Sequence, residues 1–389
     1  MILYLAIYFA FSIYYFVASK QAVSHPHFFW GAMFTLSLIV GLGDMLGGYD
    51  RYAYCELFDR CADFVYAGKY PFVDDNPIMN YQNEMSYVVL NVLISHVTAN
   101  RYIFILILTF VAYAMLYNSL QRYVKNNPFA LLLFMGLFFF FTFTYLRQVM
   151  ATCFTWYAFR YVIKKQFIPF ALCAFIAYKF HNSAIIFFPM YFLPAKKFSK
   201  RTIVYVLLGL LIIGATGLPS NLYSVYGDVS GTDSRTEQYV VYGQSFRLEY
   251  VLEVAVFLWL ILKRYDKIPE DREHLVFLNA SLIFFAVLLF FVTSSSAGRQ
   301  TWYFMIGLIY TLTYLVSLKS FSTDKYKLVI YILNTVLFFR IVWSWGGLIS
   351  PYKTFLTQGH RPGDAIFLRY EYDENYDKDK FYRPLFYLK

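Results

Sequence analysis

Long apolar stretches, separated by short polar segments, recur along most of the chain. A helix that crosses the hydrocarbon core of a bilayer needs about 20 predominantly apolar residues. The pattern therefore predicts an all-α polytopic membrane protein with about ten full transmembrane helices. The stretches lie near residues 2–19, 28–47, 102–120, 128–145, 148–163, 203–219, 250–264, 275–293, 302–318 and 328–345.

Two further apolar segments do not fit as single crossings. Residues 85–99 would reach only about 22 Å as a helix, which predicts a helix lying in the outer interface of the membrane. Residues 167–193 lie between two basic loops, so this segment must cross twice or not at all. Its length predicts a hairpin of two half-helices that meet at residues 179–183, with His181 at the tip.

Lysine and arginine cluster in alternate polar segments, which the positive-inside rule places in the cytoplasm. These segments are residues 122–125, 164–165, 196–201, 263–267 and 319–327. The opposite set, which includes the acidic segment 49–84, is expected outside, together with the N-terminus. The sequence thus predicts one transmembrane domain, residues 1–345, with outer loops at 48–101 and 220–249. Residues 346–389 are expected to form an extracytoplasmic tail.

Composition excludes several classes of function. The 389 residues are 59% hydrophobic, with a mean hydropathy of +0.47, which is too apolar for a soluble chain. The net charge of +10 is therefore attributed to cytoplasmic loops, and no nucleic-acid partner is expected. The four cysteines have no metal-ligand or disulfide spacing, and no phosphate-binding glycine loop, GxSxG or HExxH occurs. Neither a metal nor a cofactor is expected.

An Arg-Gln pair occurs twice at a predicted helix start on the outer face, at Arg147-Gln148 and at Arg299-Gln300. A cation there opposes the positive end of the helix dipole, so the arrangement is favourable only when an anion is also bound. Pyrophosphate fits this requirement, with Arg247 as a further candidate ligand. The alternative is that these arginines extend toward lipid headgroups.

Three groups on the same face could transfer a proton, namely Asp50, Glu84 and His181. Asp50 follows the glycine turn 47–48, Glu84 precedes the interfacial segment, and His181 has a side chain whose usual pKa is near neutrality. Tyr49, Tyr54 and Tyr303 could stack on sugar rings. The alternatives are an interfacial aromatic belt with a solvated Asp-Arg pair, and a structural histidine that bonds to backbone.

Together these motifs resemble the EpsG family of the Wzy-type polymerases of bacterial polysaccharide. The resemblance covers about residues 30–352, although Gly43-Asp44 stands where the family often has an arginine. The motifs are the Gly48/Asp50/Tyr54 turn, Glu84 with Tyr87, the Arg147/Gln148/Ala151 helix start, the Phe180/His181/Ser183/Ala184 hairpin and Arg299 with Tyr303.

The resemblance implies a class C glycosyltransferase-like fold in the bacterial cytoplasmic (inner) membrane, with an active site that faces the periplasm or the exterior. Donor and acceptor would be undecaprenyl-pyrophosphate-linked oligosaccharides, joined into O-antigen, capsular or exopolysaccharide. A hydroxyl of one repeat unit would attack the anomeric carbon of the other, helped by Asp50, Glu84 or His181. Membrane lipids, a chain-length regulator and a flippase are the expected partners.

Two other classes of function are compatible with the same pattern. One is a glycosyltransferase that uses a polyprenyl-phosphate sugar, or an O-antigen ligase, since both bind an anionic polyprenyl donor at the outer face. The other is a flippase for lipid-linked oligosaccharides, which would be no enzyme. Transporters usually show paired broken helices in two similar halves, whereas only one such hairpin is predicted here.

Overall fold

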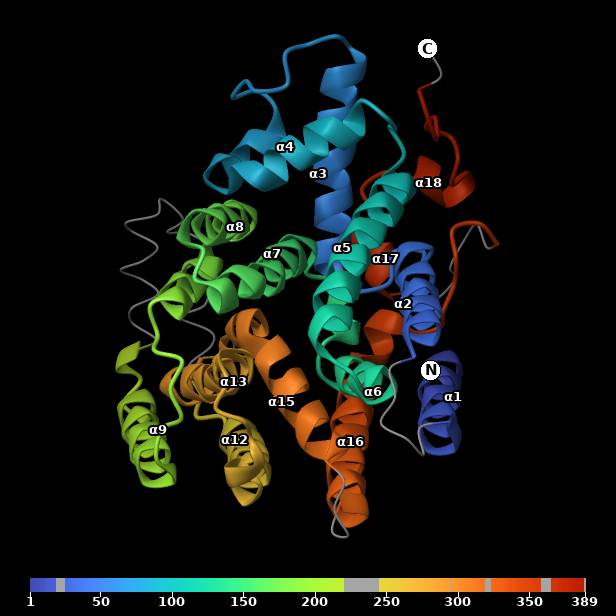
Figure 1. Cartoon of the computed structure of the whole chain (residues 1–389). Helices are drawn as coiled ribbons and strands as arrows, with labels where there is room; N and C mark the ends of the chain where they lie inside the picture. Colours follow the sequence, from blue (N-terminus) through green and yellow to red (C-terminus); the bar gives the residue numbers. More distant parts are fainter. Residues whose placement is uncertain (19–24, 220–244, 295, 319–322, 358–364, 388–389) are drawn as a thin grey trace. The chain divides into compact units, whose positions relative to one another are not determined.

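The computed structural model describes the chain except for residues 19–24, 220–244, 295, 319–322, 358–364 and 388–389. The described residues are mainly helical and include no β-strand (Figure 1). The all-α prediction is therefore confirmed. Most of the predicted outer loop 220–249 lies outside the described residues.

Each predicted apolar stretch contains helical structure, although two of the stretches are divided between a 3₁₀-helix and an α-helix. Three of the described helices are long and apolar enough to cross a membrane, and shorter apolar helices accompany them. The chain is thus a membrane protein, and the exact number of crossings stays a prediction. The three helices are Arg101–Tyr123, Arg272–Phe290 and Lys325–Ile349.

The chain forms two compact units, and three α-helices contribute residues to both. The first unit comprises Met1–Tyr157, Phe175–Asn182 and Leu328–Lys389, and the second comprises Ala158–Ala174 and Ser183–Lys327. The shared helices are α7 (Leu146–Lys164), α8 (Phe167–Phe180) and α16 (Thr323–Ile349).

The other elements of the first unit are α1 (Ile2–Ala18), α2 (Pro26–Gly41), α3 (Tyr49–Tyr66), η1 (Pro77–Glu84), α4 (Met85–Ser95), α5 (Arg101–Tyr123), α6 (Asn127–Leu137), η2 (Phe139–Phe143), α17 (Ala365–Tyr370) and α18 (Asn375–Lys378). Those of the second unit are η3 (Asn182–Tyr191, from Ser183 onward), α9 (Lys200–Ala215), α12 (Leu248–Lys263), η4 (Tyr265–Lys267), α13 (Arg272–Phe290), α14 (Ala297–Gln300), η5 (Thr301–Phe304) and α15 (Met305–Ser317).

The stretch 128–145, expected as one helix, is broken in the structure. Helix α6 ends at Leu137, and a 3₁₀-helix, η2, follows from Phe139 to Phe143. The hydroxyl of Thr142 donates to the carbonyl of Phe139 at 2.6 Å, a local bond that competes with the α-helical pattern. The break places an irregular turn at residues 144–145, immediately before α7.

Backbone carbonyls next to this turn are bound by a buried arginine of α3. Arg51 donates to the carbonyl of Phe143 at 2.8 Å and to that of Val40 at 3.0 Å. Gly47, with φ at 121°, lies so close that a Cβ there would stand 2.5 Å from the carbonyl oxygen of Phe143. Only glycine fits this approach without strain. The α2–α3 turn is therefore fixed against the segment that begins α7.

The outer segment 48–101, expected as a polar loop with one interfacial helix, contains more regular structure than predicted. It folds into α3, η1 and α4, of which α4 corresponds to the interfacial helix predicted for 85–99. Helix α3 contacts η1, α4 and α5. It has buried Tyr52, Cys55 and Phe58 on one side and exposed charged residues on another, so its amphipathic pattern suits a surface helix.

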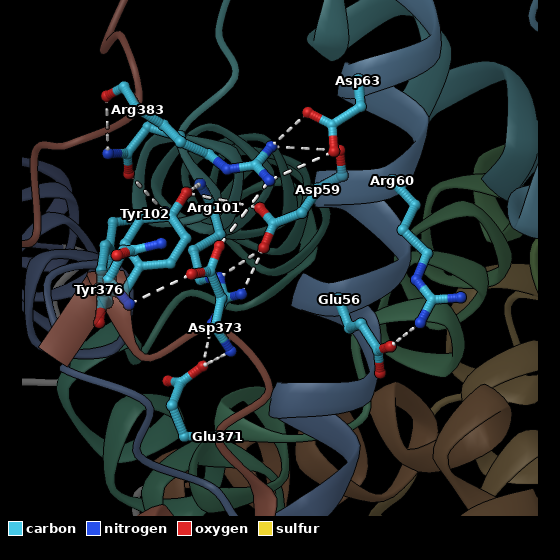
Figure 2. A network of polar contacts seen from close by, with 12 residues as sticks. Glu56, Asp59, Arg60, Asp63, Arg101, Tyr102, Glu371, Asp373, Tyr376 and Arg383 are labelled. Atoms are coloured by element: carbon cyan, nitrogen blue, oxygen red, sulfur yellow. Dashed lines mark hydrogen bonds and ion pairs between the residues drawn. The ribbon is translucent and has the colours of Figure 1, made fainter.

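The C-terminal tail packs against α3 and α5 through buried charges (Figure 2). Arg101 at the start of α5 donates to Asp59 of α3 and, at 2.8 Å, to Glu371 of the tail. Its guanidinium also lies 4.1 Å from the ring centre of Tyr376. Since each of these ionic groups is buried, each needs its partner. The tail is thus part of the fold of the first unit.

A second buried pair joins the tail to the end of α2. Lys380 lies 3.3 Å from Asp44, whose carboxylate also accepts a hydrogen bond of 2.8 Å from the hydroxyl of Tyr102. Both charged side chains are buried, with 4% and 3% of their surfaces exposed. Without the tail, Asp44 would lose this cation.

The Asp44–Lys380 pair provides a test of the role of the tail. Asp44→Asn and Lys380→Met, each alone, should destabilise the protein by about 3–5 kcal/mol, because each leaves one charge buried without its partner. The double variant should recover most of this loss. The measurement is the midpoint of thermal unfolding in detergent, followed by tryptophan fluorescence.

The matched control is Arg60→Met, which removes the exposed Glu56–Arg60 pair of α3 and should cost less than about 1 kcal/mol. A double variant that is as unstable as the sum of the two single variants would show that the two charges do not depend on each other.

Candidate functional site

A polar cluster in the first unit forms around Arg147, in the first turn of α7. The guanidinium forms an ion pair with Glu84, the last residue of η1, and donates through Nε to the hydroxyl of Tyr54 at 3.3 Å. Only 14% of the Arg147 side chain and 8% of the Glu84 side chain are exposed. The structure therefore brings together three candidates that lie far apart in the sequence.

Three tyrosine rings surround this guanidinium. The ring centres of Tyr81, Tyr54 and Tyr87 lie 4.5, 5.4 and 5.9 Å from its carbon atom. Tyr87 also contacts Tyr54 and Tyr81 edge to face, at 5.9 and 5.7 Å between ring centres. A cation within about 6 Å of an aromatic ring is attracted by the ring quadrupole. The rings thus fix the position of the positive charge.

The turn that contains His181 belongs to the same cluster. Helix α8 ends at Phe180 and η3 begins at Asn182, so His181 lies at the turn between them, where the sequence predicts the hairpin tip. The backbone N–H of Asn182 donates to Glu84 at 3.2 Å, and Lys179 donates to the carbonyl of Asn83 at 3.4 Å. Glu84 therefore binds both the turn and Arg147.

The electrostatic environment keeps Glu84 ionised. Burial by itself would raise the pKa of this carboxyl, but the charge of Arg147, the neighbouring His181 and the N–H of Asn182 outweigh burial. The pKa of Glu84 therefore lies below its ordinary value of 4.5. An anion of this kind is a weak proton acceptor at neutral pH.

The sequence predicts that an anion binds Arg147, and in the structure a carboxylate of the chain itself does so. The expectation was a substrate pyrophosphate, whereas in the structure the carboxylate of Glu84 neutralises the guanidinium. Sequence reasoning placed Glu84 and Arg147 on the same face but did not pair them. It also missed Tyr81, whose signal was the spacing of Tyr81, Glu84 and Tyr87 at three-residue intervals.

Asp50 and Tyr49 both lie at the start of α3 but differ in their surroundings. Asp50 is in the first turn, one turn before Tyr54, and its charge acts on the Tyr54 hydroxyl. Tyr49 is 51% exposed, and its ring lies 4.7 Å from that of Tyr370 in the tail. Asp50 thus acts on a member of the Arg147 cluster, whereas Tyr49 contacts the tail. Gln148, the residue after Arg147, is buried.

The remaining candidates belong to the second unit. Arg299 and Gln300 lie in α14, a helix of only four residues that is followed by η5 before α15 begins at Met305. The second Arg-Gln pair therefore stands in a broken helix rather than at the start of a regular one. The local reason is a hydrogen bond of 2.7 Å from the Thr301 hydroxyl to the carbonyl of Gly298.

Tyr303 and Arg247 have partners within this second unit. Tyr303 is fully buried, and its hydroxyl lies 2.7 Å from that of Ser183. Arg247 precedes α12, its backbone N–H donates to Val292 at 3.1 Å, and its guanidinium lies 3.3 Å from Glu249. A fully buried Tyr303 offers no free face to a sugar in this conformation.

The chain matches the model of a known protein family. The model of the EpsG family matches residues 28–354, which is most of the chain. No curated protein and no solved structure matches the chain significantly.

The lowered pKa of Glu84 gives a pH-dependent test of the cluster. Because the pKa is lower in the folded than in the unfolded state, the stabilisation is complete above about pH 4.5 and is lost as the pH falls through the folded value. Glu84→Gln should therefore lower the unfolding midpoint at pH 7, and the difference from the wild type should narrow as the pH falls below about 4.5. Thermal unfolding at a series of pH values measures this difference.

Glu56→Gln is the matched control, because it removes a carboxylate of the same type from the partly exposed pair with Arg60. It should change the midpoint little at any pH. A Glu84→Gln difference that stays constant over the acid range would contradict the ion pair.

Proposed function

The chain belongs to the EpsG family, whose members are membrane proteins of the polysaccharide-polymerase type. We propose that it joins oligosaccharide repeat units linked to undecaprenyl pyrophosphate, at the extracytoplasmic face of the bacterial inner membrane. The observation that carries this proposal is the cluster around Arg147. It presents a cation that is held in place before any substrate binds.

Arg147 is suited to stabilise a pyrophosphate leaving group. A guanidinium has five N–H donors, and the bonds to Tyr54 and Glu84 engage Nε and Nη1. The position in the first turn of α7 adds the positive end of a helix dipole. Charge that develops on the departing pyrophosphate would therefore meet donors that need no rearrangement.

Among the three candidate bases, we favour His181. The lowered pKa of Glu84 makes that carboxylate a poor proton acceptor, and Asp50 is stabilised as an anion by the N-terminus of α3. His181 follows α8 directly and shares its turn with the N–H that binds Glu84. A neighbouring carboxylate stabilises an imidazolium as it forms, as in other carboxylate–histidine pairs.

In the proposed reaction a hydroxyl oxygen of one repeat unit attacks the anomeric carbon of the other. The bond from that carbon to the pyrophosphate breaks, and undecaprenyl pyrophosphate departs with the electron pair. The hydroxyl proton passes to His181, and Arg147 stabilises the charge on the leaving group. The scheme uses no nucleotide, metal or cofactor, because the activated bond is already present in the substrate.

The other candidate ligands keep the roles expected from the sequence. Arg299, Gln300, Gln148 and Arg247 are proposed to contribute to pyrophosphate binding. Tyr49, Tyr54 and Tyr303 are proposed to contact sugars. Tyr49 is the best supported, because it is 51% exposed, whereas Tyr54 and Tyr303 are buried and their rings would have to be uncovered first. A class C glycosyltransferase-like fold, a chain-length regulator and a flippase as partners belong to the same proposal.

Substitution of Arg147 tests the proposed leaving-group role. Purified protein in proteoliposomes, mixed with the lipid-linked repeat unit alone, should form a ladder of products on a gel. Arg147→Lys should slow ladder formation by at least about 100-fold, because a lysine keeps the charge but lacks the fork of donors.

The matched control separates catalysis from folding. The double variant Glu84→Gln/Arg147→Met removes both buried charges, so it should fold with near wild-type stability but form no ladder. A normal ladder from this variant would refute the role of Arg147. A ladder from the wild type without any nucleotide sugar excludes both the flippase and the single-sugar transferase, while a single transfer to an acceptor lipid would indicate a ligase.

The proposed base gives a further prediction. His181→Gln should lower the rate of ladder formation by about 100-fold or more, as expected for loss of a general base. The rate of the wild type should decrease at low pH, because a protonated imidazole cannot accept the proton. Any residual activity of the variant should not show this decrease at low pH. Asp50→Asn is the control and should retain the decrease. If Asp50→Asn abolishes it instead, Asp50 is the base.

A further inference from the structure

A cavity of about 220 Å³ lies between α9 and α13 in the second unit. Its walls are almost entirely apolar and include Phe198, Ile203, Val206, Leu207, Ile283 and Ala286. Val206 is more than half exposed, so the cavity opens toward the surface of this unit. An open apolar cavity in a membrane protein is suited to a hydrocarbon chain.

Helix geometry explains why the cavity lies toward the N-terminal ends of α9 and α13. Near the end of α9, Gly214 approaches the carbonyl oxygens of Leu289 and Phe290 so closely that a Cβ would clash with them. The helices therefore touch there, and the cavity lies toward their N-terminal ends. Counting back at about 1.5 Å per residue puts Asn279 roughly level with Ile203, about one turn from the start of α9.

Asn279 is the distinctive polar group of the cavity wall. Its Nδ2 donates to the carbonyl of Pro194 at 2.9 Å, and that carbonyl can only accept, so the orientation of the amide is fixed. Its Oδ1 is buried and accepts no hydrogen bond from the described residues, although the side chain is only 5% exposed. A buried acceptor of this kind is costly unless a donor is supplied from outside.

Two cations lie near the start of α9, the end of the helix that carries the cavity. The ammonium of Lys196 is 6.0 Å from the ring centre of Phe198, and Arg201 directly precedes Thr202, another residue of the wall. Lys197 and Lys200 are paired with Glu270 and Asp266, at 3.7 and 2.8 Å. In the described part of the chain, no carboxylate lies within ion-pair distance of Lys196 or Arg201, and both side chains are exposed.

From these features we infer that the groove between α9 and α13 binds one anionic phospholipid with a hydroxyl-bearing headgroup, of the phosphatidylglycerol type. One acyl chain occupies the cavity beside Val206 and Ala286. The phosphate lies between Lys196 and Arg201, whose long side chains reach the headgroup level. A headgroup hydroxyl donates to Oδ1 of Asn279. This site is independent of the proposed transfer reaction.

Native mass spectrometry of the full-length protein, released from detergent and titrated with dioleoyl-phosphatidylglycerol, tests the inference. The first lipid should bind more tightly than any further lipids that bind to the same protein molecule. Val206→Trp, which fills the cavity, should weaken this first event at least about tenfold. Tyr205→Trp is the matched control, because Tyr205 is the exposed neighbour on α9 and is not part of the cavity wall. It should bind as the wild type does.

Headgroup recognition is tested with the same assay. Lys196→Ala/Arg201→Ala should weaken phosphatidylglycerol binding while leaving that of phosphatidylcholine unchanged, and Ala286→Phe provides a second cavity-filling variant in case Val206→Trp does not fold. Equal binding of phosphatidylglycerol by the wild type and by a folded cavity-filled variant would overturn the site. A clear preference for phosphatidylcholine, or for undecaprenyl phosphate, would overturn the assigned lipid class.

Discussion

Buried arginines of the first unit can be kept charged only if the fold supplies each of them with acceptors, and this requirement organises the unit. Arg51 is bound by two backbone carbonyls, Arg101 by two carboxylates, and Arg147 by Glu84 and a tyrosine. In each case the acceptors come from a different part of the chain. Because a buried unpaired charge costs several kcal/mol, these contacts hold together segments that hydrophobic packing alone would not align.

The same requirement gives Glu84 a role other than the expected one. Its carboxylate binds the side chain of Arg147 and the backbone of Asn182, so it orients two elements at once. A carboxylate used in this way is unsuited to accept a proton, because its ionised form is the stabilised one. In the proposed reaction, Arg147 would stabilise the leaving group, Glu84 would position Arg147, and His181 would accept the proton. This division of roles supports a transfer reaction that draws its energy from the substrate.

Both units contain ion pairs formed within the unit, and in the first the tail supplies partners for Arg101 and Asp44. Buried amide oxygens without a donor from the described residues also occur in both units, at Asn91 and Asn334 in the first and at Asn279 in the second. Asn279 differs because it lies in the wall of an open apolar cavity. A polar group of this kind beside an apolar groove and exposed cations matches the composition of a phospholipid, which combines hydrocarbon, hydroxyl and phosphate. The membrane itself can thus complete the second unit.

The sequence by itself determined the elements, because transmembrane length and apolar character are local properties. It predicted the all-α membrane fold, the helix start that contains Arg147 and the turn at His181 from windows of about 20 residues. Only the tertiary structure decided that Glu84 pairs with Arg147, 63 positions away, and that the tail packs against α5, about 270 positions away. Such pairings depend on which helix faces meet in space. A local pattern carries no information on this, because the same charged residue satisfies it whether it faces solvent, lipid or a partner.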